Sequence, residues 1–232
     1  RQLVHLIQRK HGEYVSVKPQ TDIFFLKRLM AKHPPSPPRI EIPPDEVALF
    51  QYTGGTTGTP KAAMLSHRNL VANTLQLSAW FVKAEKGHEV VMAAIPFFHV
   101  YGMTVCMIFG LHAGGNVVMV PRRRPIDGVM KVIQKTKVTI FPGVPTLYTA
   151  INNHPDVKKY ALGSVKLCLS GAAPLPLEVA ETFERLTGGR LVEGFGMTEC
   201  SPVATANPLF GQRKIGTIGL PMPDTDAKIV DL

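Results

Sequence analysis

The chain has 232 residues, enough for one large domain or two small ones, and 45% of them are hydrophobic, enough for a substantial core. The formal net charge of +9 favours an anionic partner such as nucleic acid, an acidic membrane surface or a polyphosphate. The three cysteines are widely spaced, with no pair at metal-ligand spacing, which argues against a disulfide framework and favours a reducing compartment.

The first predicted elements follow a proline-rich segment. Residues 33–45, HPPSPPRIEIPPD, contain six prolines and are expected to be extended. The strand VALFQYT (47–53) comes next. Ser66 is then a candidate N-cap for a helix over 67–82.

Strands and helices alternate along the rest of the chain. Strands are expected at 89–95, 116–120, 138–144, 165–170 and 190–193, and helices at 99–113, 126–136, 145–153 and from the first turn at Pro176 to a cap at Gly188. Strands rich in Val and Ile that alternate with helices predict an α/β fold with a mostly parallel sheet flanked by helices. Residues 90–121 carry no charged side chain, but prolines and glycines interrupt them, so they indicate buried core and not a membrane span.

Residues 52–61, YTGGTTGTPK, are rich in potential phosphate ligands. Three glycines let backbone amides approach a ligand closely, four threonines add hydroxyl donors, and Lys61 adds a charge suited to phosphate. The stretch lacks the Gly-Lys-Ser/Thr ending of a Walker A loop, and its glycines are wrongly spaced for a dinucleotide fingerprint. We predict a phosphate loop of a third kind; the alternative is a flexible surface loop.

Two further glycine-containing loops follow predicted strands. SGAAPLP (170–176) follows one strand and GFGMTE (194–199) follows the next. The stretch at 52–61, called the Gly/Thr loop below, follows a third strand. All three loops are therefore expected on the carboxyl edge of one sheet, where such folds bind ligands. Three loops on one edge indicate a site more strongly than any one of them.

Together, these motifs closely resemble those of the adenylate-forming enzymes: acyl-CoA synthetases, luciferases and peptide-synthetase adenylation domains. PFFHVYG (96–102) and GTIGLPMP (216–223) match two more family signatures, and the five signatures occur in family order. The residues within these motifs are most similar to those of bacterial long-chain fatty acyl-CoA ligases. The resemblance implies that residues 1–50 are part of an N-terminal region and that residues 51–232 are an incomplete AMP-binding domain. The C-terminal domain is expected to be absent, because both ends look cut from a longer protein.

The resemblance also implies two-step chemistry. A carboxylate attacks the α-phosphate of ATP to give acyl-AMP and pyrophosphate, and the thiol of coenzyme A then takes the acyl group. The β- and γ-phosphates would be held by Thr53, Gly55, Thr56, Thr57, Gly58 and Lys61. Gly171, Ala172 and Ala173 would form one wall of the adenine pocket and Phe195 would flank the adenine. Thr198 would contact the α-phosphate, Glu199 would hold Mg²⁺, and His99 would lie where the acyl and CoA channels meet. Thr198, Lys61 and Glu199 are the expected catalytic residues.

The physical chemistry of the reaction agrees with this assignment. The carboxylate and the triphosphate repel each other, so a bridging cation and an acidic ligand such as Glu199 are expected. The structural alternatives are a helix-start glutamate for Glu199 and a hydrogen-bonded core residue for His99. Phe195 stands where the family often has tyrosine, and Ala62 where many relatives have glycine.

Other functions stay open at this stage. Within the family, the substrate could be an aromatic or medium-chain acid instead of a fatty acid. A second class of function is that of a nucleotide-binding domain without catalysis. A nucleic-acid binder is not expected, because the basic run Arg122–Arg124 has no interleaved aromatic residues. The expected location is cytoplasmic, and peripheral membrane association and homo-oligomerisation are both left open.

Overall fold

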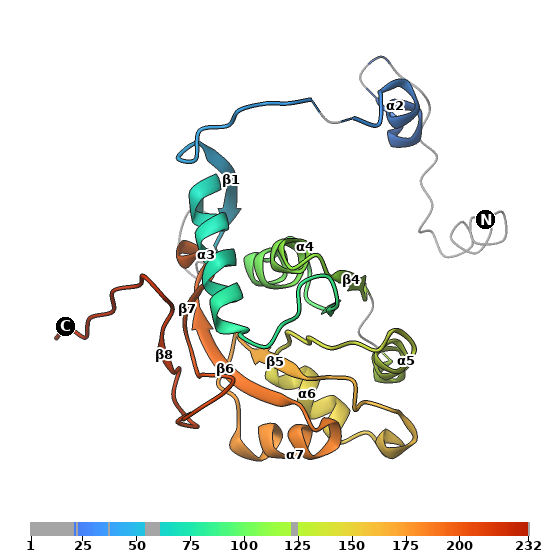
Figure 1. The fold of residues 1–232 in the computed structure, drawn as a ribbon, viewed down its shortest axis with the longest axis vertical. Helices are drawn as coiled ribbons and strands as arrows, with labels where there is room; N and C mark the ends of the chain where they lie inside the picture. The colour runs from blue at the N-terminus through green and yellow to red at the C-terminus, as the bar shows by residue number, and fades with distance from the viewer. Residues whose placement is uncertain (1–20, 22, 37, 54–60, 122–124, 232) are drawn as a thin grey trace. The chain divides into compact units, whose positions relative to one another are not determined.

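The computed structural model describes residues 21, 23–36, 38–53, 61–121 and 125–231. Contacts divide the chain into two units, Arg1–Ile42 and Pro43–Leu232. In the first unit the structure describes helix α2 (Leu26–Lys32), which has no buried residue. The second unit contains the sheet and the candidate site (Figure 1).

A mostly parallel sheet forms the centre of the second unit. Its parallel strands are β3 (Val90–Ala93), β4 (Asn116–Met119), β5 (Leu167–Ser170) and β6 (Arg190–Gly196). β3 pairs with β4, and β5 pairs with β6. Ile140 links the two pairs through parallel bridges to Val91 and Leu167. The order is therefore β4, β3, the segment around Ile140, β5 and β6, which confirms the predicted α/β class.

The segment at 138–144 is less regular than predicted. It forms isolated bridges at Ile140 and Gly143 and no continuous strand. Pro142 lies between these two residues, and proline has no N–H to donate to a ladder.

β6 extends beyond its predicted end at 193. Its last residues, Gly194–Gly196, pair antiparallel with β7 (Val203–Ala206), which in turn pairs with β8 (Leu220–Pro221). A Cβ atom on Gly196 would lie 2.2 Å from the carbonyl oxygen of Pro202, so only glycine lets these segments approach so closely. The sheet is therefore parallel through the first half of β6 and antiparallel beyond it.

Helices cover both faces of this sheet (Figure 1). They are α3 (His67–Trp80), η1 (Gly102–Ile108), α4 (Phe109–His112), α5 (Ile126–Thr136), α6 (Pro145–Asn152), η2 (Val157–Lys159), α7 (Leu177–Thr187) and η3 (Thr198–Cys200). Ser66 caps α3 as predicted, and the Asn69 side chain completes a reciprocal capping pair. Gly188 ends α7 in the left-handed conformation, as predicted, but Pro176 is the N-cap of that helix and not part of its first turn. The helix predicted at 99–113 forms as η1, a π-helix, followed by α4.

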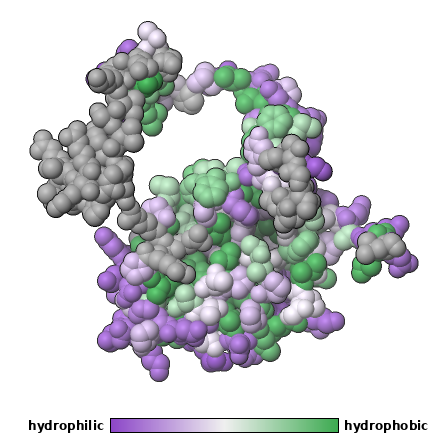
Figure 2. Space-filling model, turned by 180° about the vertical axis from the view of Figure 1, so that it is seen from behind, coloured by the Kyte–Doolittle hydropathy of each residue, from purple (hydrophilic) through white to green (hydrophobic). Residues whose placement is uncertain are grey.

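Two buried clusters hold the helices to the sheet. On one face Tyr148 packs edge-on against Phe183, with ring centroids 4.9 Å apart, beside Phe141. On the other face Phe81 packs against Phe109, with centroids 5.0 Å apart. Figure 2 shows mainly hydrophilic atoms at the lower edge of the second unit, where α6 and α7 lie in Figure 1. Among the described residues, no helix is both long and apolar enough to cross a membrane.

The Gly/Thr loop does not leave the parallel sheet. It connects β1 (Val47–Tyr52) to β2 (Ala62–Ser66), which form an antiparallel pair of their own. The strand at 47–53 is thus confirmed to within one residue, but the expectation that all three loops follow strands of one sheet is wrong. Tyr52 pairs directly with Ala62, so the loop closes a hairpin.

Candidate functional site

A cavity of about 480 Å³ opens at the carboxyl ends of β5 and β6. Its lining includes seven of the residues predicted from the sequence: Thr53, His99, Gly171, Ala172, Phe195, Thr198 and Glu199. The lining also includes residues that were not predicted: Val100, Tyr101, Leu169, Gly194, Gly196, Met197, Pro202 and Val203. Four stretches that are distant in the sequence therefore meet around one cavity.

Some predicted residues are not in this lining. Ala173 and Lys61 are both exposed and lie outside it. Gly55, Thr56, Thr57 and Gly58 lie outside the described residues. The two ends of their loop are nevertheless joined, because the backbone N–H of Thr53 donates to the Lys61 carbonyl at 2.9 Å. Since Thr53 lines the cavity, the loop starts and ends close to it.

Tyr101 supports the β5 side of the cavity. Its hydroxyl donates to the carbonyl oxygens of Leu169, at 2.6 Å, and Gly143, at 3.2 Å. Burial raises the pKa of Tyr101 well above its ordinary value, so the hydroxyl remains protonated and remains a donor. The ring lies against Gly171, where an added Cβ atom would be 3.2 Å from a ring carbon. Ala172 follows with a φ of 70°, in the left-handed region, and is exposed to the cavity.

The β6 side of the cavity presents an aromatic ring and a hydroxyl. Phe195 is 41% exposed and sits in the antiparallel part of β6, opposite Thr205. Its open ring offers an apolar face on which a planar heterocycle can stack. Thr198 begins the short helix η3 and is half-buried.

Glu199 lies in the same short helix, with its side chain exposed. The described residues contain no cluster of three His, Cys, Asp or Glu that could hold a metal. A single carboxylate suits Mg²⁺, which keeps waters and takes substrate phosphates as its other ligands. The exposed Glu199 carboxylate therefore fits a metal that takes its other ligands from water and a bound polyphosphate.

His99 is exposed at the cavity, so the alternative of a buried core histidine is wrong. The backbone N–H of Tyr101 donates to His99 Nδ1 at 3.1 Å. Nδ1 is therefore an acceptor, which places the proton of the neutral ring on Nε2.

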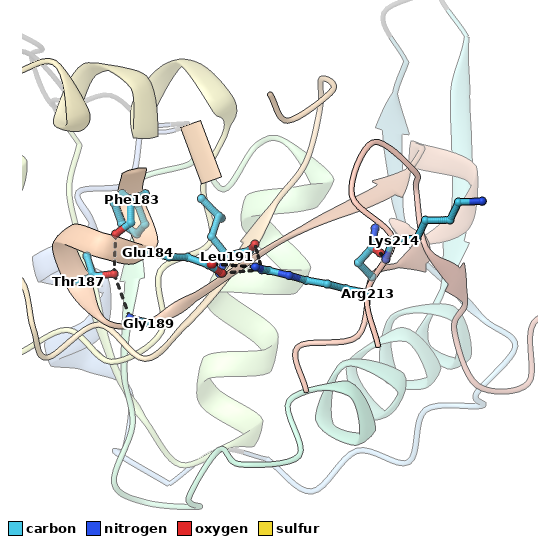
Figure 3. Close-up of polar contacts among 8 residues, drawn as sticks. Phe183, Glu184, Thr187, Gly189, Leu191, Arg213 and Lys214 are labelled. Carbon is cyan, nitrogen blue, oxygen red and sulfur yellow. Dashed lines mark hydrogen bonds and ion pairs between the residues drawn. The ribbon is translucent and has the colours of Figure 1, made fainter. Parts of the chain in front are cut away.

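An ion pair outside the cavity fixes the chain that follows β7 (Figure 3). The Arg213 guanidinium donates to both carboxylate oxygens of Glu184, at 2.6 and 2.8 Å. It also donates to the carbonyl of Leu191, whose N–H donates back to Glu184 at 2.8 Å. Burial alone would raise the pKa of Glu184, but the hydrogen bonds from Arg213 and Leu191 outweigh it and hold the pKa below its ordinary value. Sequence reasoning missed this pair, because no local pattern links residues in α7 to a loop beyond β7.

The chain is similar to curated acid–CoA ligases. It is 47% identical over 192 residues to the long-chain-fatty-acid–CoA ligase of Bacillus subtilis (strain 168), covering 83% of this chain and 34% of the relative. It is 39% identical over 193 residues to the enzyme of the same name from Escherichia coli O6:H1, again with 34% of the relative covered. The chain thus spans about a third of the length of the curated relatives it matches.

Solved structures show the same fold. ATP-bound MatB from Rhodopseudomonas palustris matches with a TM-score of 0.76 and 33% identity, over 85% of this chain and 38% of MatB. The anthranilate CoA ligase AuaEII, in complex with anthranoyl-AMP, matches with a TM-score of 0.83 over 100% of this chain and 46% of that one; at 24% identity this match shows the fold alone. The family model described as AMP-binding enzyme matches residues 5–232. The chain therefore belongs to the AMP-binding enzyme family, and seven of its predicted site residues line one cavity.

Proposed function

We propose that the chain is part of a long-chain fatty acid–CoA ligase. In the first step, an oxygen of the fatty acid carboxylate attacks the α-phosphorus of ATP, and pyrophosphate leaves. In the second step, the sulfur of coenzyme A attacks the acyl carbonyl carbon, AMP leaves, and the thiol proton is lost. The observation that carries the proposal is the single cavity that collects Thr53, His99, Gly171 and the residues of β6 and η3.

The cavity walls suit the parts of a nucleotide. Gly171 and Ala172, with the adjacent Ala173 outside the lining, would offer a wall of small residues, and the exposed ring of Phe195 would offer a stacking surface for adenine. The hydroxyl of Thr198, which lies in the cavity lining, would donate to the α-phosphate. The Gly/Thr loop, from Thr53 to Lys61, would cradle the β- and γ-phosphates with backbone amides and hydroxyls.

Glu199 would hold Mg²⁺ with the phosphates. The bound ion would neutralise charge between the incoming carboxylate and the triphosphate, which is the main electrostatic barrier to their meeting. Lys61 would add positive charge at the same phosphates. His99, with its proton on Nε2, would contribute a donor at the entry for the acid and coenzyme A.

A specific observation favours a second candidate substrate class. The chain is 33% identical over 205 residues to 4-coumarate-CoA ligase 1 of Narcissus pseudonarcissus, covering 37% of that relative. An aromatic acid would use the same nucleotide site and differ only in the acid pocket. The alternative from another class of function is nucleotide binding without turnover.

A ligase that uses ATP and coenzyme A is expected in the cytoplasm.

ATP–pyrophosphate exchange by the intact parent enzyme tests the proposal, with long-chain, medium-chain and aromatic acids as separate substrates. We expect the highest exchange with long-chain acids. If the exchange rate were highest with aromatic or medium-chain acids, the enzyme would belong to the second substrate class. If no acid supported exchange, only the nucleotide-binding function would remain. Glu199→Gln should abolish most of the exchange, whereas Glu178→Gln, which changes an exposed glutamate of α7 outside the cavity, should leave it unchanged.

A further inference from the structure

Asn73 is a buried polar residue in the middle of α3. It is 2% exposed, and an asparagine is unfavourable in a helix interior and costly to bury unless its amide is hydrogen-bonded. Its Nδ2 donates to the Val203 carbonyl at 2.8 Å, and its Oδ1 accepts from the Val203 N–H at 3.1 Å. Nδ2 also donates to Oε1 of Gln76 at 2.8 Å. A residue that breaks the local rule for its helix is therefore held by long-range pairing with Val203, which indicates a role beyond helix formation.

The amide of Asn73 takes the place of a neighbouring strand. In an extended segment the N–H and C=O of one residue point to the same edge, where a paired strand would exchange two hydrogen bonds with them. Asn73 supplies both bonds to Val203, the first residue of β7. β7 also pairs with β6, and the Met197 N–H donates to the Pro202 carbonyl at 3.0 Å. Pro202 and Val203 are thus held both by α3, which runs alongside β7 in Figure 1, and by the chain that follows β6.

The same helix is fastened to the chain around β7 and β8 at two further points. Gln76 Nε2 donates to the Pro223 carbonyl at 2.6 Å, and Trp80 Nε1 donates to the Asn207 carbonyl at 3.0 Å. Both side chains leave the helix on the face that carries the buried asparagine, since residues three and four apart share a face. At its other end α3 follows β2 directly, and β2 closes the hairpin of the Gly/Thr loop. The helix therefore fixes the start of β7 relative to the hairpin that carries the proposed phosphate ligands.

Pro202 and Val203 line the cavity of the candidate site and form what we call the Pro202–Val203 wall. With Val100, they are apolar lining residues that the proposed nucleotide contacts do not use. A long-chain acid presents only hydrocarbon beyond its carboxylate, and an apolar wall binds hydrocarbon by removing it from water. These residues therefore suit the acid, an assignment that rests on the proposed function.

We propose that Asn73 is a positioning residue that fixes the Pro202–Val203 wall and thereby sets how tightly the acid binds. Asn73 is not in the cavity lining, and its hydrogen bonds to Val203 are to the backbone, so it acts on the position of the wall and not on its chemistry. Without the amide, the Val203 N–H and C=O lose their partner, and the segment shifts to find another. The shift alters the fit of the acid more than that of the nucleotide, whose proposed ligands lie on β6, η3 and the loops after β1 and β5.

Asn207 offers a matched control in the same fold. It is 4% exposed, its Nδ2 donates to the Thr217 carbonyl at 2.6 Å, and its Oδ1 accepts from the Lys214 N–H at 3.0 Å. Asn207 and both of these partners lie outside the cavity lining. Substitution of either asparagine therefore removes the same kind of buried backbone pairing, at the cavity wall in one case and away from it in the other.

Amide hydrogen exchange of the full chain tests the contact itself. Leucine keeps the branched shape of asparagine without its hydrogen-bonding groups. In Asn73→Leu the Val203 amide should exchange about tenfold faster or more, and the Lys214 amide should not change. Asn207→Leu should show the reverse. No acid, ATP or turnover enters this measurement, so its failure is distinct from a failure of the proposed ligase activity.

Titration of the intact parent enzyme with cis-parinaric acid, a fluorescent long-chain acid, tests the effect on the site. Asn73→Leu should weaken binding of this acid about threefold to tenfold, and should leave the affinity for a fluorescent ATP analogue within about twofold. Asn207→Leu, with a comparable loss of stability in urea, should bind both probes as the parent enzyme does. Asn73→Ser and Asn207→Ser are milder changes that give the same comparison if a leucine variant does not fold.

Several results would overturn the proposal. One is an unchanged exchange rate of the Val203 amide in the Asn73 variants. Another is an equal loss of acid binding in the Asn73 and Asn207 variants, or an equal loss of acid and nucleotide binding, since either would mean general loosening of the fold. Absence of acid binding by the parent enzyme would also overturn it. By contrast, a parent enzyme that binds the acid but supports no ATP–pyrophosphate exchange would contradict the proposed ligase activity and not the role of Asn73.

Discussion

Deleting one buried hydroxyl tests whether Tyr101 links the core to the cavity. Tyr101→Phe removes the donor to the Leu169 and Gly143 carbonyls and leaves the ring in place. Both carbonyls keep another donor: Gly143 N–H donates to Leu169 at 3.0 Å, and Gly171 N–H donates to Gly143 at 3.2 Å. No acceptor is orphaned, so the free energy of unfolding should fall by only about 1 kcal/mol, or ~2–4 °C in Tm for a domain of this size.

Tyr148→Phe is the matched control in the same core. Among the described residues, only Tyr148 donates to the Phe141 carbonyl, at 2.8 Å, so this substitution leaves an unpaired buried acceptor. Its cost should be larger, about 1–3 kcal/mol. Tyr148 does not line the cavity, whereas Tyr101 does and its ring lies against Gly171. Tyr101→Phe should therefore weaken nucleotide binding about threefold to tenfold, while Tyr148→Phe should not.

Urea unfolding followed by circular dichroism gives the two stabilities, and titration with a fluorescent ATP analogue gives the two affinities. Our reasoning predicts opposite rankings: the less destabilising substitution has the larger effect on binding. If Tyr148→Phe weakened binding as much as Tyr101→Phe, the effect would be general loosening of the core, and the assigned role of Tyr101 would be refuted.

Three further substitutions probe the surroundings of the cavity. Arg213→Met should lower the free energy of unfolding by about 1–3 kcal/mol, because it leaves the Glu184 carboxylate largely buried without its partner. The pKa of Glu184 is depressed in the folded state, so the stability from this pair is present above the carboxyl's ordinary pKa and is lost as pH falls through the folded pKa. Urea midpoints measured against pH should show this loss of stability at acid pH in the parent chain and not in the variant. Gly196→Ala should cost several kcal/mol or prevent folding, because the new Cβ atom would meet the Pro202 carbonyl at 2.2 Å; unchanged thermal stability would contradict this. Glu199→Gln should leave stability within about 0.5 kcal/mol, because the side chain is exposed, yet should raise the Mg²⁺ concentration needed for ATP–pyrophosphate exchange; normal exchange at all Mg²⁺ concentrations would exclude a metal ligand.

Elements set by local chemistry could be predicted from the sequence. The helix at 126–136 has the predicted bounds, since its apolar periodicity ends at a clear break. The cap at Ser66 and the left-handed end at Gly188 are also as predicted, because each depends on one residue and its immediate neighbours. Helix and strand positions along the sheet follow from the same kind of signal.

Long-range pairing could not be predicted in this way. The hydroxyl of Tyr101 reaches a carbonyl 68 residues away, and Arg213 pairs with Glu184 across 29 residues. No periodicity or spacing encodes such contacts. The hairpin was missed because no strand was predicted at 62–66, where β2 pairs with β1 across the Gly/Thr loop.

The motif GFGMTE shows how packing and chemistry share one short stretch. Gly196 is required by close approach, because an added Cβ atom would lie 2.2 Å from the backbone carbonyl oxygen of Pro202. At Gly194 an added Cβ atom would lie 2.9 Å from the end of the Leu169 side chain, so that side chain would have to shift. These glycines let β6 pass from its parallel partner β5 to its antiparallel partner β7. That change of partner leaves Phe195 between them with its ring open to the cavity, and brings Thr198 and Glu199 to the rim in the next short helix. The glycines therefore place the chemical groups without needing to touch a ligand, and substitutions at them should be judged first by stability and only then by activity.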